Sequence, residues 1–235
     1  MDRRGFIERL GGAVVVGSGI VAGRQSDGRY RNPTVTDPLV RQWEIEARET
    51  DRFDVRRRGI DFGDAYRTTL IYKDVRLTEA VDTRLQSDFE GIVGVFIATR
   101  ITFDSPLSAL ARPGLVDGIA KRRFERTARK RGFTELRERE PAERETTQAQ
   151  ATAEYVGYYD IDRYSEAPVP NIERFPGIRR NGRVKTVLYF DVSRSDGSLI
   201  LTTGVRPTNE FFRTVLHRNS DTYRGELLRL MHSVR

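Results

Sequence analysis

The sequence predicts an α+β domain, in which helices pack on an antiparallel sheet of about five to seven strands. Several segments alternate apolar and polar residues with a period of two, as strands do. Asp196 and Gly197 separate two of these segments, and an Asp-Gly pair in that position is a strong hairpin signal. Residues 115–131 instead place their apolar residues at helical spacing.

The first third of the chain contains one predicted helix and a long strand region. Apolar residues of segment 38–49 lie near one helical face, so we predict a helix there, with a strand as the alternative. Residues 56–59 and 62–64 are rich in Arg, Gly and Asp, and we predict loops. Alternation from Tyr66 predicts a strand through residue 77, and the same pattern continues to residue 85.

The middle of the chain predicts a central strand followed by helix. Residues 91–103 are apolar on both faces as far as Ala98, as expected for a strand covered on both sides. Asp104-Ser105-Pro106 is a helix start signal for a short turn over residues 107–111. The strongest helix signal, residues 115–131, stops before Gly132, a natural C-cap.

The second half predicts the remaining strands and two helices. Four strands are expected, over residues 134–139, 148–162, 184–192 and 199–205. Residues 141–147 are charged and predict a turn, and residues 165–181, with three Pro, predict a long loop. Helices are expected after Pro207 and from Ser220, which we predict as a cap.

Residues 1–23 predict an export signal. A membrane-spanning helix needs about 20 apolar residues, whereas residues 10–23 supply fourteen, five of them Gly. A short apolar stretch behind basic residues is typical of a cleavable signal, and Arg3, Arg4 and Phe6 resemble the twin-arginine motif. An amphipathic helix and an uncleaved anchor are the alternatives. We therefore expect an exported, extracytoplasmic or cell-surface protein.

This interpretation divides the chain into three parts. The signal is followed by a polar segment, residues 24–37, which predicts a flexible spacer, and then by a single domain over residues 38–235. An export translocase would be a transient partner. The sequence does not indicate an oligomeric state.

The residue content excludes several chemistries. The absence of Cys removes disulfides, thiol nucleophiles and thiolate metal sites. His217 and His232 are fifteen positions apart and form no local metal-binding pair. No nucleophile elbow, P-loop or dinucleotide motif is present. Asp160 and Asp162 would share one strand face, which fits a solvated strand end, with a cation site as the alternative. The acidic residues around Asp196 fit a hairpin turn. We predict no catalytic residue, metal or cofactor.

The first candidate binding surface is the basic face of helix 115–131. Its cations are Lys121, Arg122, Arg126, Arg129 and Lys130. With a formal net charge of +7 on the chain, such a face suits an anionic partner, although a merely solvated face is the alternative. Phe124 falls on the apolar side of the helix, which argues against nucleic-acid binding, where aromatics stack on bases.

The second candidate is a ligand groove beside strand 148–162. Tyr155, Tyr158 and Tyr159 form an aromatic cluster just before loop 165–181. These rings would line a groove between the sheet and the loop, or else pack beneath the loop.

Several of these features together resemble a group of small uncharacterised exported proteins of halophilic archaea. The resemblance rests on the leader, strand 93–103, Ser105-Pro106-Leu107 and the closing hairpin 184–205, and covers roughly residues 66–216. It implies export. The order of elements is also similar to the PsbP/Mog1-like fold, a sandwich of helices around an antiparallel sheet, which implies no activity.

The function expected from the sequence is that of an exported, non-enzymatic module that binds a protein partner or an anionic component of the cell envelope. A small-ligand-binding protein, with its groove beside loop 165–181, is the alternative. A hydrolase that uses carboxylates is a remoter one.

Overall fold

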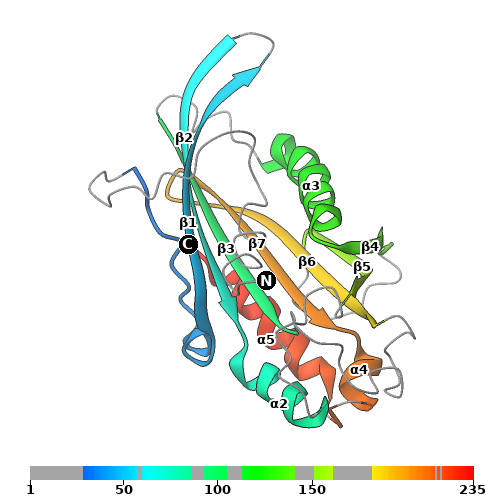
Figure 1. Cartoon of the computed structure of the whole chain (residues 1–235). Coiled ribbons are helices and arrows are strands. Elements are labelled where there is room, and N and C mark those ends of the chain that lie inside the picture. The colour runs from blue at the N-terminus through cyan, green and yellow to red at the C-terminus, as the bar shows by residue number, and fades with distance from the viewer. Residues whose placement is uncertain are drawn as a thin grey trace.

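The computed structural model describes residues 29–57, 60–85, 93–104, 113–140, 151–160, 182–214, 216–217 and 219–235. Within them the chain forms a seven-stranded antiparallel sheet with helices packed on it (Figure 1), which confirms the predicted α+β class. The strands are β1 (Glu44–Arg57), β2 (Ile60–Lys73), β3 (Val95–Phe103), β4 (Phe133–Glu138), β5 (Ala153–Asp160), β6 (Arg183–Ser195) and β7 (Ser198–Pro207). The helices are the 3-10 helix η2 (Pro38–Gln42), α2 (Val75–Leu85), α3 (Pro113–Lys130), α4 (Asn209–Thr214) and α5 (Ser220–His232).

The strands lie in the order β1-β2-β3-β7-β6-β5-β4. β3 pairs with both β2 and β7, so it has the central position that its apolar sequence predicts. Residues 60–64 of β2 pair with β1 and not with β3. The β1–β2 hairpin therefore extends beyond the rest of the sheet (Figure 1).

The two faces of the sheet carry separate cores, because consecutive strand residues point to opposite sides. On one face, Leu188 and Phe190 pack with Phe124 of α3. On the other, Val187 and Tyr189 pack with residues of α5. α3 and α5 thus cover opposite faces (Figure 1).

The end of the sheet near α2 and α4 carries a third, smaller core. Leu77 and Val81 of α2 pack there with Phe211 and Phe212 of α4. Figure 1 shows these two helices at the same end of the sheet. The two helices cover that end of the sheet. By contrast, α3 leaves Arg122, Arg126 and Lys130 exposed to solvent.

The segment before β1 is attached to the C-terminus. Val35 forms a β-bridge with Val234, and the Thr34 amide donates to the Arg235 carbonyl at 2.8 Å. These contacts involve residues 29–37, the described part of the segment expected as a spacer. They join the two ends of the described fold side by side.

The predicted helix at 38–49 is wrong beyond its first turn. Only Pro38–Gln42 coil, as η2, and β1 begins at Glu44, so the strand alternative holds from there. The local cap signal at Asp37 starts one turn, in which the Asp37 side chain accepts from the Leu39 amide at 2.9 Å. Pairing of the following residues with β2 then outweighs helix propensity.

The predicted strand continuation over residues 75–85 is also wrong, because these residues form α2. Leu77 and Val81 are four positions apart, a spacing that fits both a strand face and a helix face. The helix is settled by Asp74, whose carboxylate accepts from the Leu77 amide at 3.0 Å as an N-terminal cap. The loop predicted at 62–64 is likewise wrong, since β2 passes through it.

The later elements agree with the sequence. Each end of β3, α3, β4, β5, β6 and β7 lies within five residues of the predicted bound, and α4 and α5 follow. Asp196 and Gly197 have φ of 49° and 72°, the left-handed values that a two-residue hairpin turn requires. The cap of α5 is Asn219 and not Ser220. The predictions for residues 107–111, 141–147 and 165–181 lie outside the described residues.

Candidate anion-binding surface

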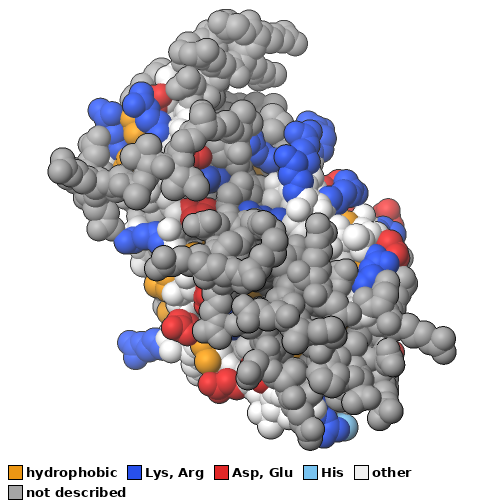
Figure 2. Space-filling view, in the orientation of Figure 1, with side chains coloured by type: hydrophobic (Ala, Val, Ile, Leu, Met, Phe, Trp, Pro, Cys, Tyr) orange, Lys and Arg blue, Asp and Glu red, His pale blue; other side chains and the backbone are white. Residues whose placement is uncertain are grey.

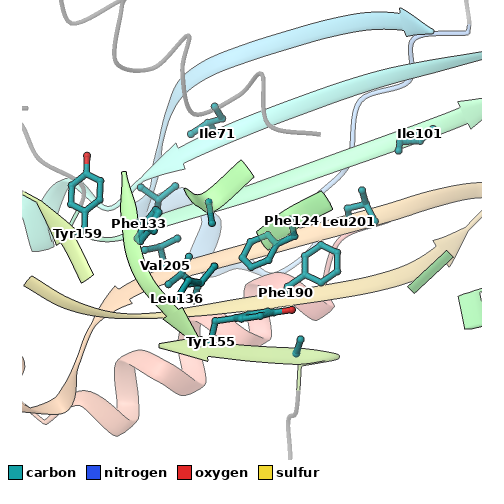
Figure 3. Close-up of a cluster of buried hydrophobic side chains, with 14 of the residues drawn as sticks. Ile71, Ile101, Phe124, Phe133, Leu136, Tyr155, Tyr159, Phe190, Leu201 and Val205 are labelled. Atoms are coloured by element: carbon teal, nitrogen blue, oxygen red, sulfur yellow. The ribbon is translucent and has the colours of Figure 1, made fainter. Parts of the chain in front are cut away.

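The position of α3 follows from its apolar side. Phe124 stacks on Phe190 of β6, with ring centroids 4.9 Å apart, and lies 5.2 Å from the Tyr155 ring of β5 (Figure 3). Ala128, one turn further on, is also buried. Burial of a Phe side chain contributes roughly 1.5–3 kcal/mol. This packing fixes the rotation of the helix about its axis, and with it the direction of every polar residue.

Three cations form a stripe on the solvent side of α3. Arg122, Arg126 and Lys130 are four positions apart and so share one side of the helix, and all three are exposed. Among the described residues, none of the three forms a hydrogen bond or a close ion pair. Arg122 and Lys130 lie about 12 Å apart along the axis. We call these three residues the basic stripe; Figure 2 shows Lys and Arg side chains gathered over α3.

The other two predicted cations have partners on one flank of α3. Lys121 donates from Nζ to Glu138 Oε1 of β4 at 2.7 Å. Arg129 lies 3.7 Å from Glu125 Oε2 one turn earlier, and also donates to a backbone carbonyl of β4 at 3.4 Å. These contacts attach the helix to the edge of the sheet. The structure thus separates the predicted set into three solvent-facing cations and two paired ones.

The opposite flank brings Arg123 near a buried arginine of β2. Arg67 is 4% exposed, and its Nη2 donates to Asp51 of β1 at 3.3 Å. Its Nε and Nη1 are buried without a hydrogen-bond partner. Burial lowers the pKa of Arg67, an effect opposed by Asp51 and Glu49. Burial, followed by the positive charges of Arg67 and Arg126, lowers the pKa of Arg123.

Arg67 and Arg123 are not among the residues that the sequence predicts to contact a partner. Ala65 and Ile71 of the same strand belong to the α3-side core, so Arg67 falls on the inward positions of an alternating strand. A charged residue at such a position is unusual, and it is the signal that would have identified Arg67. Arg123 had no such signal, because neighbouring residues of the helix are equally basic.

The three tyrosines of the predicted groove do not share one face. Tyr155 and Tyr159 are buried in the α3-side core, where the Tyr159 ring lies 5.1 Å from Phe133. Tyr158 points to the other face, and the Arg183 guanidinium lies 5.3 Å from its ring centroid. The structure therefore brings Tyr155 and Tyr159 together as packing residues and separates them from Tyr158. Loop 165–181, the other wall of that groove, lies outside the described residues.

The two histidines lie apart. His217 is 2.8 Å from Arg84 at the end of α2, and His232 is 3.9 Å from Asp191 of β6. In the part of the chain that the structure describes, no group of three or more His, Cys, Asp or Glu is placed to hold a metal ion. The Asp160 side chain and Asp162 are outside that part.

The predicted export motif, Arg3, Arg4 and Phe6, also lies outside the described residues. Among the helices that are described, none is both long enough and apolar enough to cross a membrane.

Comparison with known proteins gives no relative. No protein-family model, no curated protein and no solved structure matches this chain.

Proposed function

We propose that this protein is an exported, non-enzymatic binding module whose basic stripe contacts an anionic polymer of the cell envelope. The observation that carries the proposal is the stripe itself, Arg122, Arg126 and Lys130, which has no carboxylate partner within the described fold. Like charges four residues apart destabilise a helix by roughly 0.2–0.5 kcal/mol per pair. A polyanion lying along α3 would remove this repulsion.

The geometry of α3 favours a polymer over a lipid surface or a nucleic acid. Helices that insert into a membrane interface expose an apolar side, whereas Phe124 and Ala128 of α3 are buried against the sheet. Binding of single strands uses aromatic rings beside the cations, and the ring of Phe124 stacks inward on Phe190. A straight row of cations about 12 Å long fits an extended chain of carboxylates or phosphates.

The two other functions expected from the sequence have less support. A groove at the tyrosines would need accessible rings, but Tyr155 and Tyr159 are each 1% exposed. A carboxylate hydrolase would need converging acids. Of the buried acids among the described residues, Glu154 is paired with Arg139 at 2.5 Å and Asp74 accepts from the Leu77 amide at the start of α2. Export itself rests on residues 1–23, as argued from the sequence.

Binding of the full chain to fluorescent poly-glutamate tests the proposal. We expect the affinity to fall with rising salt, and R122Q/R126Q/K130Q to weaken it about 100-fold if each cation contributes about 1 kcal/mol near an anionic surface. The matched control is R41Q/R76Q/K185Q, which removes the same charge from exposed positions away from α3. The control should bind within about threefold of the wild type.

Two results would contradict this function. If the stripe variant and the control variant weaken binding equally, net charge and not α3 attracts the polymer. If the wild type binds phosphatidylglycerol vesicles but not the polymer, the partner is a lipid surface.

A further inference from the structure

The flank of α3 that faces β2, here called the inner flank, differs chemically from the basic stripe. Its two cations, Arg67 of β2 and Arg123 of α3, are partly or fully buried. Arg67 is 4% exposed, and Arg123 is half-buried. A guanidinium removed from water is strongly destabilising unless its N–H groups find acceptors. Two such groups beside one another therefore need a source of negative charge.

The sheet supplies only part of that charge. In the row of cross-strand neighbours through Arg67, Asp51 stands on one side and the apolar residues Ile101 and Leu199 on the other. Asp51 accepts one hydrogen bond from Nη2, at 3.3 Å. The buried Nε–H and the two N–H groups of Nη1 have no acceptor.

The next row offers no acceptor to Arg67 either. It contains Glu49, Thr69 and Thr99 in register, but the two threonine hydroxyls are bonded to each other at 3.0 Å. Glu49 is near enough to Arg67 to act on it electrostatically without receiving a hydrogen bond from it. Neither of these two rows of the sheet therefore supplies the acceptors that Arg67 lacks.

The local charge balance gives the class of the missing group. Burial lowers the pKa of both arginines; Arg67 is near enough to Arg123 to lower its pKa further, whereas Asp51 and Glu49 raise the pKa of Arg67. The unfilled donors of Arg67, beside a second guanidinium, call for a negatively charged acceptor. Guanidinium groups pair preferentially with carboxylate and phosphate oxygens.

We infer that Arg67 and Arg123 form a binding site for a small oxyanion, a carboxylate or a phosphate ester, between α3 and β2. Arg67 offers three unfilled N–H donors from the sheet, and Arg123 offers a second guanidinium from the helix. Arg123 is the member of the pair that is partly exposed to solvent. This site goes beyond the proposed function, because it lies on the flank of α3 that faces β2 and does not use Arg122, Arg126 or Lys130.

Thermal unfolding of the full chain in acetate and in dimethyl phosphate, each against chloride at equal ionic strength, tests the site. A ligand that binds only the folded state raises the melting temperature, and we expect a saturable rise of about 5 °C or more at a hundredfold excess over Kd. The two salts distinguish a carboxylate from a phosphate ester. A saturable rise with either one supports the site.

The variants locate the effect. R67M keeps the length of the side chain and removes its donors, and R123Q changes the half-exposed partner; both should lose the rise. R122Q, one position along α3 on the solvent side, should keep it. If R67M does not fold, R123Q alone decides.

The inference is overturned if neither salt produces a saturable rise in the wild type, or if R123Q responds as strongly as R122Q. The basic-stripe proposal is independent of both results, because its test measures polymer binding by Arg122, Arg126 and Lys130. Retained polymer binding with no anion effect would remove only the inner site.

Discussion

Arg206 of β7 donates its Nε–H to the Tyr189 hydroxyl of β6 at 2.9 Å, with both residues 0% exposed. The Arg206 and Arg224 guanidinium carbons lie 5.7 Å and 5.9 Å from the Tyr189 ring centroid. Arg206 Nη1 also donates to Asn209 at the start of α4, at 2.8 Å. A polar network therefore joins β6, β7, α4 and α5 beneath the α5 side of the sheet, the face opposite α3.

Glu154 of β5 is the acid of this region, and its removal should be strongly destabilising. Its carboxylate is 2.5 Å from Arg139 and 3.9 Å from Arg224, and Glu154 and Arg224 are each 3% exposed. Breaking a buried pair by removing one partner leaves an uncompensated charge and costs about 3–5 kcal/mol. We expect E154Q to lower the free energy of unfolding by that order in urea denaturation.

The matched control for E154Q is E138Q, which removes the partner of Lys121 in a half-exposed pair. Pairs near the surface contribute about 0–1 kcal/mol. A loss of stability in E154Q no larger than in E138Q would mean that Glu154 is not a necessary counter-charge.

Gly204 of β7 should not tolerate a side chain. A Cβ at this position would lie 2.8 Å from Leu227 Cγ and 3.0 Å from Met231 Sδ of α5. Leu227 is fully buried and cannot move away freely. Overpacking of this kind costs about 1–3 kcal/mol, and we expect G204A to lower the melting temperature accordingly.

Gly118 provides the opposite case. It is exposed on α3, and a Cβ there meets nothing within 4 Å. Replacing a helical Gly with Ala stabilises by roughly 0.5–1 kcal/mol, so G118A should raise the melting temperature. Equal effects of G204A and G118A would contradict the close approach of α5 to β7.

Alkaline pH should destabilise the fold through three tyrosines. Burial raises the pKa of Tyr72, Tyr189 and Tyr223 above the usual value. The unfolded chain therefore releases these protons first, near pH 10. The stabilisation is complete below that pH and is lost as the pH rises towards the folded pKa values.

Urea denaturation between pH 8 and pH 11 measures this loss, and absorbance of tyrosinate in the native protein measures the ionisation directly. In Y189F the free energy of unfolding should decrease less between pH 8 and pH 11. It should already be lower than in the wild type at pH 8, because the hydrogen bond from Arg206 is lost. Native titration of all nine Tyr near pH 10 would contradict the prediction.

Asp37 should anchor the segment before β1. Its Oδ1 accepts from the Leu39 amide at 2.9 Å, and its Oδ2 accepts from Arg229 Nε of α5 at 3.1 Å. The hydrogen bond from the Leu39 amide lowers the pKa of Asp37, and Arg229 lowers it further, although burial has the opposite effect. This stabilisation is present at neutral pH and is lost as the pH falls through the lowered pKa.

Two substitutions separate the roles of Asp37. D37A removes cap and charge and should cost about 1 kcal/mol, with faster hydrogen exchange at the Thr34 and Thr36 amides, which bond to the C-terminal residues. D37N keeps a cap acceptor and should lose less. Unchanged exchange in D37A would show that the anchor lies elsewhere.

The sequence by itself determined the class of fold and the elements with long, unambiguous patterns. β3 is apolar on both faces as far as Ala98, α3 has a wide apolar side that ends before Gly132, and Asp196-Gly197 fits only a tight turn. The basic face of α3 could be predicted for the same reason, because helical periodicity alone separates it from Phe124. These features depend on residues close together in the chain.

Only the tertiary structure decided which charges have partners. Lys121 is paired because β4 places Glu138 beside it. Arg67 keeps unfilled donors because Asp51, its neighbour in β1, accepts only from Nη2 and Ile101, its neighbour in β3, is apolar. It also decided that residues 75–85 form a helix, since Leu77 and Val81 fit either period until Asp74 caps the chain. The burial of a side chain and the identity of its charged partner depend on residues that are distant in sequence, so a local sequence pattern cannot predict them.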